Sequence, residues 1–444
     1  MLNINFSRRM MLGLLVCALA RPQPASGQTA ASLIDAPPPL PRAGVLSPPA
    51  PENRLRDRIR TTLAYYYTRP VNSRDHNCWE VMHWIIAYGV EAELLRGGPG
   101  GRPVNAIGWL CYSGPCRDRP LISIERGRIT AAKGPQVQGH YGQFLAILAQ
   151  SKVMTDYSMQ SGGRAFTIAD LIESEKLGCD VGMELTFKLL ALSHYLDSDA
   201  TWLNDAGQEW SIPHLIREEL QAPIRGAACG GTHRLMGLSY AVRTRQKRDE
   251  PIDGEYLRAQ SYLDDYHRYT FGLQNPDGSF STEWFARRGD RPDLDRRLQT
   301  TGHILEWMVY SLPPEMLGDR RVVQAVDYLT TILWQNRQKT WEIGPLGHGL
   351  HALALYDERV FKESESSLPQ ELADDETTGE PAPDDASKAR RPTAKVAAKP
   401  RKSAAPAEAA PDDEPIDEES EESGEPAPDS DDGAPLLLPE LRLP

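Results

Sequence analysis

Two kinds of helical segment alternate along the chain between residues 52 and 361. In the first kind, apolar side chains lie on most faces of a helix for several turns. Because a helix that is hydrophobic all round is buried on both sides, we expect these segments to form the centre of the fold. There are six of them, at residues 78–90, 140–153, 179–196, 232–242, 304–312 and 350–356.

The second kind of segment has a single apolar stripe, which predicts a helix that is buried on one side. Thr167 stands three residues before Asp170, as in a capping box, and Pro213 stands in the first turn of its segment. These amphipathic helices are expected at residues 55–67, 167–176, 211–220, 256–272 and 320–335.

Alternation of the two kinds predicts an all-α fold, an (α/α)6 toroid in which outer helices cover inner helices. Since each connection runs from an outer to an inner helix, the inner helices would be parallel, with their N-termini at one mouth. A sixth outer helix is missing from the pattern. We expect a small irregular or hairpin insertion near residues 97–136 instead, with a turn around Gly127.

Composition divides the 444-residue chain into unequal parts. The net charge is −13, but residues 363–444 alone hold 23 acidic and 8 basic residues, so the remainder is nearly neutral. A neutral body lacks the basic surface typical of nucleic-acid binding, and no nucleic-acid partner is expected. We predict a Pro-rich linker at 28–51, the toroid at 52–361 and a disordered acidic tail at 362–444. The tail is a candidate contact for basic partners, although a solvated spacer is the favoured interpretation.

The N-terminus has the pattern of a signal peptide over residues 1–27. Arg8 and Arg9 precede a short apolar run at residues 10–20, and Ala25-Ser26-Gly27 is a small-x-small cleavage pattern. The run is too short to span a bilayer, so the mature chain is expected to lack a transmembrane helix. Export to the periplasm, envelope or extracellular space is predicted, by the Sec or the twin-arginine route. An uncleaved signal anchor is the alternative interpretation.

Residues 258–280 contain a recognisable motif. Residues 274–280 read Gln-Asn-Pro-Asp-Gly-Ser-Phe, and residues 258–263 before them read Arg-Ala-Gln-Ser-Tyr-Leu. The pair resembles the Gln-x-x-Asp-Gly-Ser-aromatic repeat of squalene cyclases. The resemblance implies the toroid of the terpenoid cyclases and protein prenyltransferases. The acid motif Asp-x-Asp-Asp of the cyclases is absent from this sequence. Prenyltransferases hold zinc through an Asp-x-Cys and a His, and Cys229 and His303 occupy similar helix starts here, with Ala227 in place of the carboxylate.

The candidate catalytic and metal-binding residues lie at the predicted mouth of the ring. Thiolate and imidazole groups are the ligands that zinc prefers, so Cys229 and His303 are the candidate metal ligands and zinc is the candidate cofactor. Asp180 and Glu184, at helical i,i+4 spacing, are a candidate acid/base pair, and His303 is a third catalytic candidate. The predicted pocket residues are Cys78, Trp79, His83, His140, Tyr141, Cys179, Cys229, His233 and His348.

Each of these residues also has a purely structural interpretation. Glycine and cysteine are small enough to pack where inner helices crowd, histidines cap loops, and the aromatic residues are ordinary core. For Cys229 and His303 packing is the favoured interpretation. The sequence therefore predicts an exported squalene cyclase-like α/α toroid, with an apolar or carbohydrate ligand in its central cavity and no assigned reaction. The alternative is a non-catalytic scaffold of the cell envelope.

Overall fold

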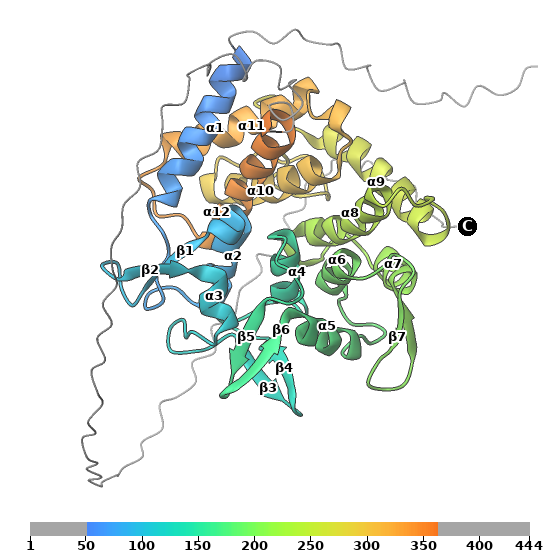
Figure 1. Cartoon of the computed structure of the whole chain (residues 1–444). Coiled ribbons are helices and arrows are strands. Elements are labelled where there is room, and N and C mark those ends of the chain that lie inside the picture. The colour runs from blue at the N-terminus through green and yellow to red at the C-terminus, as the bar shows by residue number, and fades with distance from the viewer. Residues whose placement is uncertain (1–50, 363–444) are drawn as a thin grey trace, which may run out of the picture. The chain divides into compact units, whose positions relative to one another are not determined.

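The computed structural model describes residues 51–362, and these residues are mostly helical (Figure 1). The predicted signal peptide, the linker except Pro51, and the acidic tail except Lys362 lie outside the described residues. In the described range, no helix is both long enough and apolar enough to cross a membrane.

Six helices form the buried centre of this structure. Along the chain each packs on the next, from α2 to α4, α6, α8, α10 and α12, and α12 packs back on α2. Their sequences are apolar on most faces, which is why both sides of each helix are covered. Their bounds are α2 (Cys78–Tyr88), α4 (Gln143–Gln150), α6 (Thr186–Tyr195), α8 (Thr232–Lys247), α10 (Leu294–Ser311) and α12 (Ile343–Tyr356).

A second set of helices alternates with the first along the chain and covers it. The five predicted amphipathic helices are all present, and the capping box of Thr167 and Asp170 is formed. Ser211 caps the helix that begins with Ile212 and Pro213. A sixth, short helix, α3, lies in the region where the pattern gave none. The bounds are α1 (Pro51–Tyr67), α3 (Ala106–Cys111), α5 (Ile168–Leu177), α7 (Ile212–Gln221), α9 (Gly254–Leu273) and α11 (Arg320–Gln335).

Four antiparallel hairpins correct the expectation of an all-α chain. The predicted turn at Gly127 joins β3 to β4, and Gly162-Gly163 joins β5 to β6. Both are two-residue turns with positive φ at each position, which suits the twist of a hairpin. The strands are β1 (Glu93–Arg96), β2 (Arg102–Asn105), β3 (Ile122–Glu125), β4 (Arg128–Ala131), β5 (Ser158–Ser161), β6 (Arg164–Thr167), β7 (Thr201–Leu203) and β8 (Glu209–Ser211).

Short helical turns complete the described chain. Three are 3-10 turns and the last is a π-helical turn that follows α12 directly. They are η1 (Gly89–Glu91), η2 (Ala228–Gly231), η3 (Pro314–Met316) and η4 (Asp357–Lys362).

A glycine allows the first and last buried helices to approach closely. A Cβ atom on Gly347 of α12 would stand 2.3 Å from the carbonyl oxygen of His83 in α2. A larger residue would therefore push the two helices apart. The contact of α12 with α2 depends on this glycine.

The starts of four buried helices differ from those expected, and α4 begins at Gln143, three residues after the expected start. α10 and α12 begin at Leu294 and Ile343, so His303 and His348 lie inside helices and not at their first turns. The first turns of α10 are polar and are capped by Asp293, and an apolar pattern does not detect them. α6 begins only at Thr186, because Gly182 turns the chain with φ at +80° before it.

Candidate metal centre

Three potential metal ligands meet at the N-terminal end of α8. One ligand atom each of Cys229, His233 and His303 lies within 4.8 Å of the other two. Cys229 comes from η2, His233 from the first turn of α8, and His303 from the middle of α10. His233 and His303 are buried, and Cys229 is partly exposed.

The backbone before α8 is bent so that Cys229 faces the histidines. Cys229 has φ at +49° and Gly230 has φ at +65°, and both values are left-handed. A Cβ atom on Gly230 would stand 2.3 Å from the ring of Trp284, so only glycine fits there. Cysteine rarely adopts a left-handed conformation, and such strain is concentrated at functional sites. The Thr232 hydroxyl donates a 2.9 Å hydrogen bond to the Cys229 carbonyl and stabilises the turn.

Hydrogen bonding leaves one ring nitrogen of His303 available. Its Nδ1 lies 2.7 Å from the carbonyl oxygen of Gln299, so Nδ1 carries the proton and Nε2 carries the lone pair. Metal-binding histidines commonly have this second hydrogen bond to a carbonyl or carboxylate. In His233 neither buried ring nitrogen has a hydrogen-bond partner among the described residues. An unpaired buried polar group is costly, and a metal ion would supply a partner for one of these two nitrogens.

Further histidines surround this group. The ring of His348 lies 3.8 Å from that of His303 and 5.3 Å from that of His233, measured between centroids. His83 lies 5.1 Å from His348, and His140 lies 5.6 Å from His233. The structure thus brings together five histidines that are distant in the sequence.

Burial keeps the central histidines neutral. It lowers the pKa of His233 and of His303 well below 6.5, and repulsion by His348 acts in the same direction. Burial also lowers the pKa of His83 to about 3. A neutral imidazole is the form that binds a metal, so these side chains need not lose a proton first.

Burial has the opposite effect on the thiol of Cys229. Burial raises its pKa to about 12, and Glu306 and Glu184 add to the effect. A bound divalent cation inverts this situation, because a coordinating thiol is deprotonated outright. The ligand set therefore favours a metal over a free thiolate.

A buried carboxylate lies behind the histidines. Glu306 of α10 accepts from Nδ1 of His348 at 2.7 Å and from Nδ1 of His351 at 2.5 Å. Burial alone would raise the pKa of Glu306, but His348 and His351 outweigh it and hold the pKa well below its usual range. The carboxylate fixes Nδ1 of His348 as a donor, and Nε2 of His348 has no partner among the described side chains.

The residues present fit a tetrahedral zinc ion. Around such an ion, ligand atoms stand about 3.5 Å apart, so separations within 4.8 Å require side-chain shifts of about 1 Å. One sulfur and two imidazole nitrogens make three protein ligands, the number typical of zinc sites that keep one position open.

A cavity of about 310 Å³ is lined by Cys229 but by none of the five histidines. Trp284, whose ring lies 5.6 Å from that of His303, forms one wall. Arg225 and Arg296 also line the cavity. A small ligand therefore has space beside the sulfur.

The other predicted pocket residues lie in different places. Trp79 packs on His83, with 4.0 Å between ring centroids. Cys78 donates to the carbonyl of Arg119, which ties α2 to a later loop, and Cys179 donates to the carbonyl of Glu175 in its own segment, so both thiols have structural contacts. Tyr141 is 45% exposed and contacts the ammonium group of Lys133.

The predicted acid/base pair of Asp180 and Glu184 is wrong in its geometry. Both residues precede α6, so they do not share a helix face. Asp180 is exposed and accepts from the backbone amide of Val181. Glu184 instead lies 2.7 Å from Nδ1 of His140.

Sequence reasoning missed Glu306 as a member of the site. A signal was present, because Glu306 is a single acidic residue inside the apolar run of α10. A charged residue is almost never fully buried without a partner, so its position called for partners such as His348 and His351.

The five described cysteines are all free thiols.

Comparison of the chain with protein-family models, curated proteins and solved structures gives no match. Inference about function therefore starts from the geometry of the site itself.

Proposed function

We propose that this chain is an (α/α)6 toroid that binds one zinc ion through Cys229, His233 and His303 and acts as a zinc-dependent enzyme. The observation that carries the proposal is the convergence of one thiol and two neutral imidazoles from separate elements within 4.8 Å. In this proposal α2, α4, α6, α8, α10 and α12 are the inner ring.

The packing of the helices supports the ring. Each of the six contacts its successor, and the last contacts the first. Residues from the C-terminal ends of all six line one cavity, which is the arrangement expected of parallel helices around an axis. Five long surface helices and the short α3 supply the outer members.

The ligand set supports zinc over other ions. Thiolate together with imidazole suits zinc, whereas magnesium and calcium require oxygen ligands. Three protein ligands leave a fourth position for water or substrate, and zinc there supplies Lewis-acid chemistry. The cavity of about 310 Å³ beside Cys229 would admit the substrate to this position.

Metal analysis of the full-length protein, purified without a histidine tag, tests the proposal. We expect one zinc per chain, and loss of that zinc in Cys229→Ala and in His303→Ala. Cys179→Ala is the matched control, since Cys179 is a buried thiol outside the cluster and its removal should leave the zinc in place. Wild-type protein without metal, or variants that retain it, would reject the site and favour the non-catalytic scaffold.

Cobalt substitution then separates an enzymatic centre from a structural one. The cobalt protein should have a sulfur-to-cobalt charge-transfer band that is absent from Cys229→Ala. Added azide should shift the cobalt spectrum, because an open position accepts an external ligand. A spectrum that does not respond to azide would indicate a closed structural site.

A further inference from the structure

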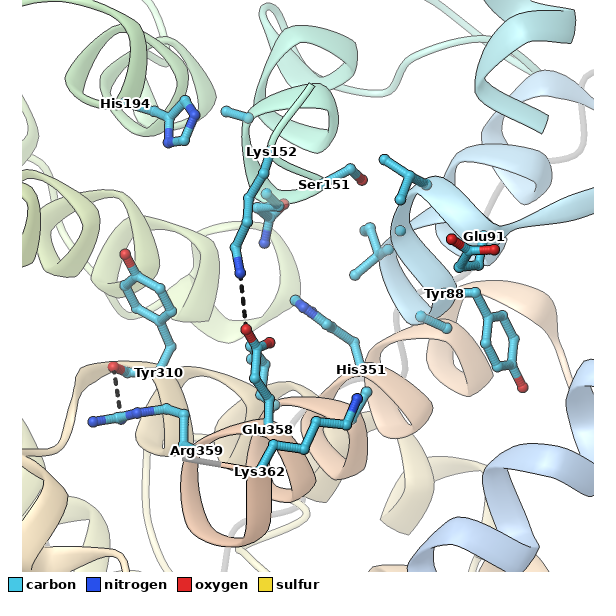
Figure 2. Close-up of a pocket in the computed structure, with 18 of the residues that line it drawn as sticks. Tyr88, Glu91, Ser151, Lys152, His194, Tyr310, His351, Glu358, Arg359 and Lys362 are labelled. Carbon is cyan, nitrogen blue, oxygen red and sulfur yellow. Dashed lines mark hydrogen bonds and ion pairs between the residues drawn. The ribbon is translucent and has the colours of Figure 1, made fainter. Parts of the chain in front are cut away.

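A second and larger cavity lies at the C-terminal ends of the buried helices. Its volume is about 840 Å³, which is within the range of small-molecule sites. Figure 2 shows its walls, with Lys152 and Glu358 joined by an ion pair and His351 beside them. It is separate from the cavity beside Cys229.

One part of the wall is strongly cationic. The basic residues come from the end of α4, the end of α8 and η4, so three separate segments direct charge to one space. Among residues 51–362, two carboxylates line the same cavity, those of Glu91 and Glu358. The basic lining residues are Lys152, Arg243, Lys247, Arg248, Arg359 and Lys362.

Some of these six basic residues have partners within the protein. Lys152 pairs with Glu358 at 2.8 Å. Arg243 and Arg359 donate to backbone carbonyls at the C-terminal end of α10, where cations stabilise the helix dipole. These three residues therefore have a structural role.

Lys247 and Lys362 have no such role in the described chain. Neither has a carboxylate within ion-pair distance among residues 51–362. Lys247 is exposed, but the protein partly desolvates its ammonium group, which lowers the pKa of Lys247, and repulsion by Arg243, Lys152 and Arg359 adds to the effect. The side chain thus lies in a positive field, and a bound anion would relieve it.

Another part of the lining is apolar. It is formed by α1, the end of α2 and the last turns of α12, and its side chains include Leu63, Ile86 and Leu355. The cavity therefore has cationic groups and an apolar surface in one wall lining. The two surfaces together match a molecule with a charged group at one end and a hydrocarbon portion at the other.

We propose that this cavity, the C-terminal cavity, binds an amphiphilic anion: a phosphate or carboxylate group joined to an apolar chain. Lys247 and Lys362 bind the charged group, and the surface of Leu63, Ile86 and Leu355 contacts the chain. The inference goes beyond the zinc centre and does not depend on it, because no ligand of the zinc lines this cavity.

Calorimetric titration of the full-length protein tests this with three probes. Dodecyl phosphate below its micelle concentration carries both features, inorganic phosphate carries only the charge, and dodecyl maltoside carries only the chain. We expect dodecyl phosphate to bind at least tenfold more tightly than either of the others. Equal binding of dodecyl maltoside, or no binding of dodecyl phosphate, would overturn the proposal.

Variants locate the binding. Lys247→Gln and Lys362→Gln should each weaken dodecyl phosphate binding about five-fold, the effect of losing one partly exposed ion pair. Lys133→Gln is the matched control, since Lys133 lies outside the C-terminal cavity. Unchanged affinity in the Lys247→Gln, Lys362→Gln double variant would also overturn the proposal, and both lysines are exposed, so folding should not be affected.

Discussion

Acidification should destabilise the protein through His83, a histidine of the cluster that is not a proposed ligand. The side chain is 2% exposed, and burial, reinforced by His348, lowers its pKa from 6.5 to about 3. Between pH 6.5 and about 3, His83 therefore binds a proton in the unfolded state but not in the folded state. The resulting stability is fully present above pH 6.5 and is lost progressively as the pH falls towards 3.

The size of the effect follows from this shift. Each pH unit below 6.5 lowers the free energy of unfolding by about 1.4 kcal/mol for one such histidine, which is about 2 kcal/mol at pH 5. His83→Leu removes the titrating group. We expect the loss of stability between pH 7 and pH 5 to be about 2 kcal/mol smaller in His83→Leu than in the wild-type protein.

Urea unfolding at the two pH values, followed by tryptophan fluorescence, measures the difference. Comparing the pH-dependent change within each protein cancels the direct effect of the substitution on packing. His76→Gln is the matched control, because His76 lies in a loop outside the cluster and should keep the wild-type response. An equal loss of stability in wild type and His83→Leu would show that His83 does not cause this pH dependence.

Three further substitutions test the packing around the site. Glu306→Ala should lower the free energy of unfolding by about 3–5 kcal/mol, because His348 and His351 lose a buried charged partner; a change below 1 kcal/mol in urea unfolding would contradict this. Gly347→Ala should lower the free energy of unfolding by about 1–3 kcal/mol, since its Cβ would approach the His83 carbonyl oxygen to 2.3 Å. An unchanged urea midpoint would show that α2 and α12 do not pack as described. Lys188→Met should lower the free energy of unfolding by about 3–5 kcal/mol because it leaves Glu175 unpaired. Adding Glu175→Leu should recover much of that loss, and a double variant no more stable than Lys188→Met would show that the unpaired carboxylate is not the cause.

Much of the helical framework could be predicted because burial imposes a period on the sequence. The stripe at residues 320–335 coincides with α11, and the caps at Thr167 and Ser211 mark real helix starts. The same reasoning failed where a helix begins in polar sequence, as α10 does at Leu294. Three of the four hairpins were also missed, since strands of three or four residues are too short to establish a period.

The candidate site was predicted less completely than the helices. The pairing of Cys229 with His303 followed from the order of the buried helices, and their ligand atoms do lie within 4.8 Å. His233 was expected in the pocket but not as a ligand. The left-handed turn at Cys229 and Gly230 brings the thiol close to His233, and the helical pattern did not predict this turn. Such a turn has no periodic signal. Asp180 and Glu184 were misjudged because Gly182 interrupts the helix that would have aligned them.

Zinc binding by Cys229, His233 and His303 is tested by anomalous diffraction from crystals of the full-length protein, recorded on both sides of the zinc absorption edge. We expect one strong peak between Cys229 Sγ and ring nitrogens of His233 and His303, where those atoms lie within 4.8 Å of one another. The peak should vanish in crystals of Cys229→Ala. Absence of a peak at this position in wild-type crystals grown with zinc, or a peak held by other residues, would contradict zinc binding by these three residues.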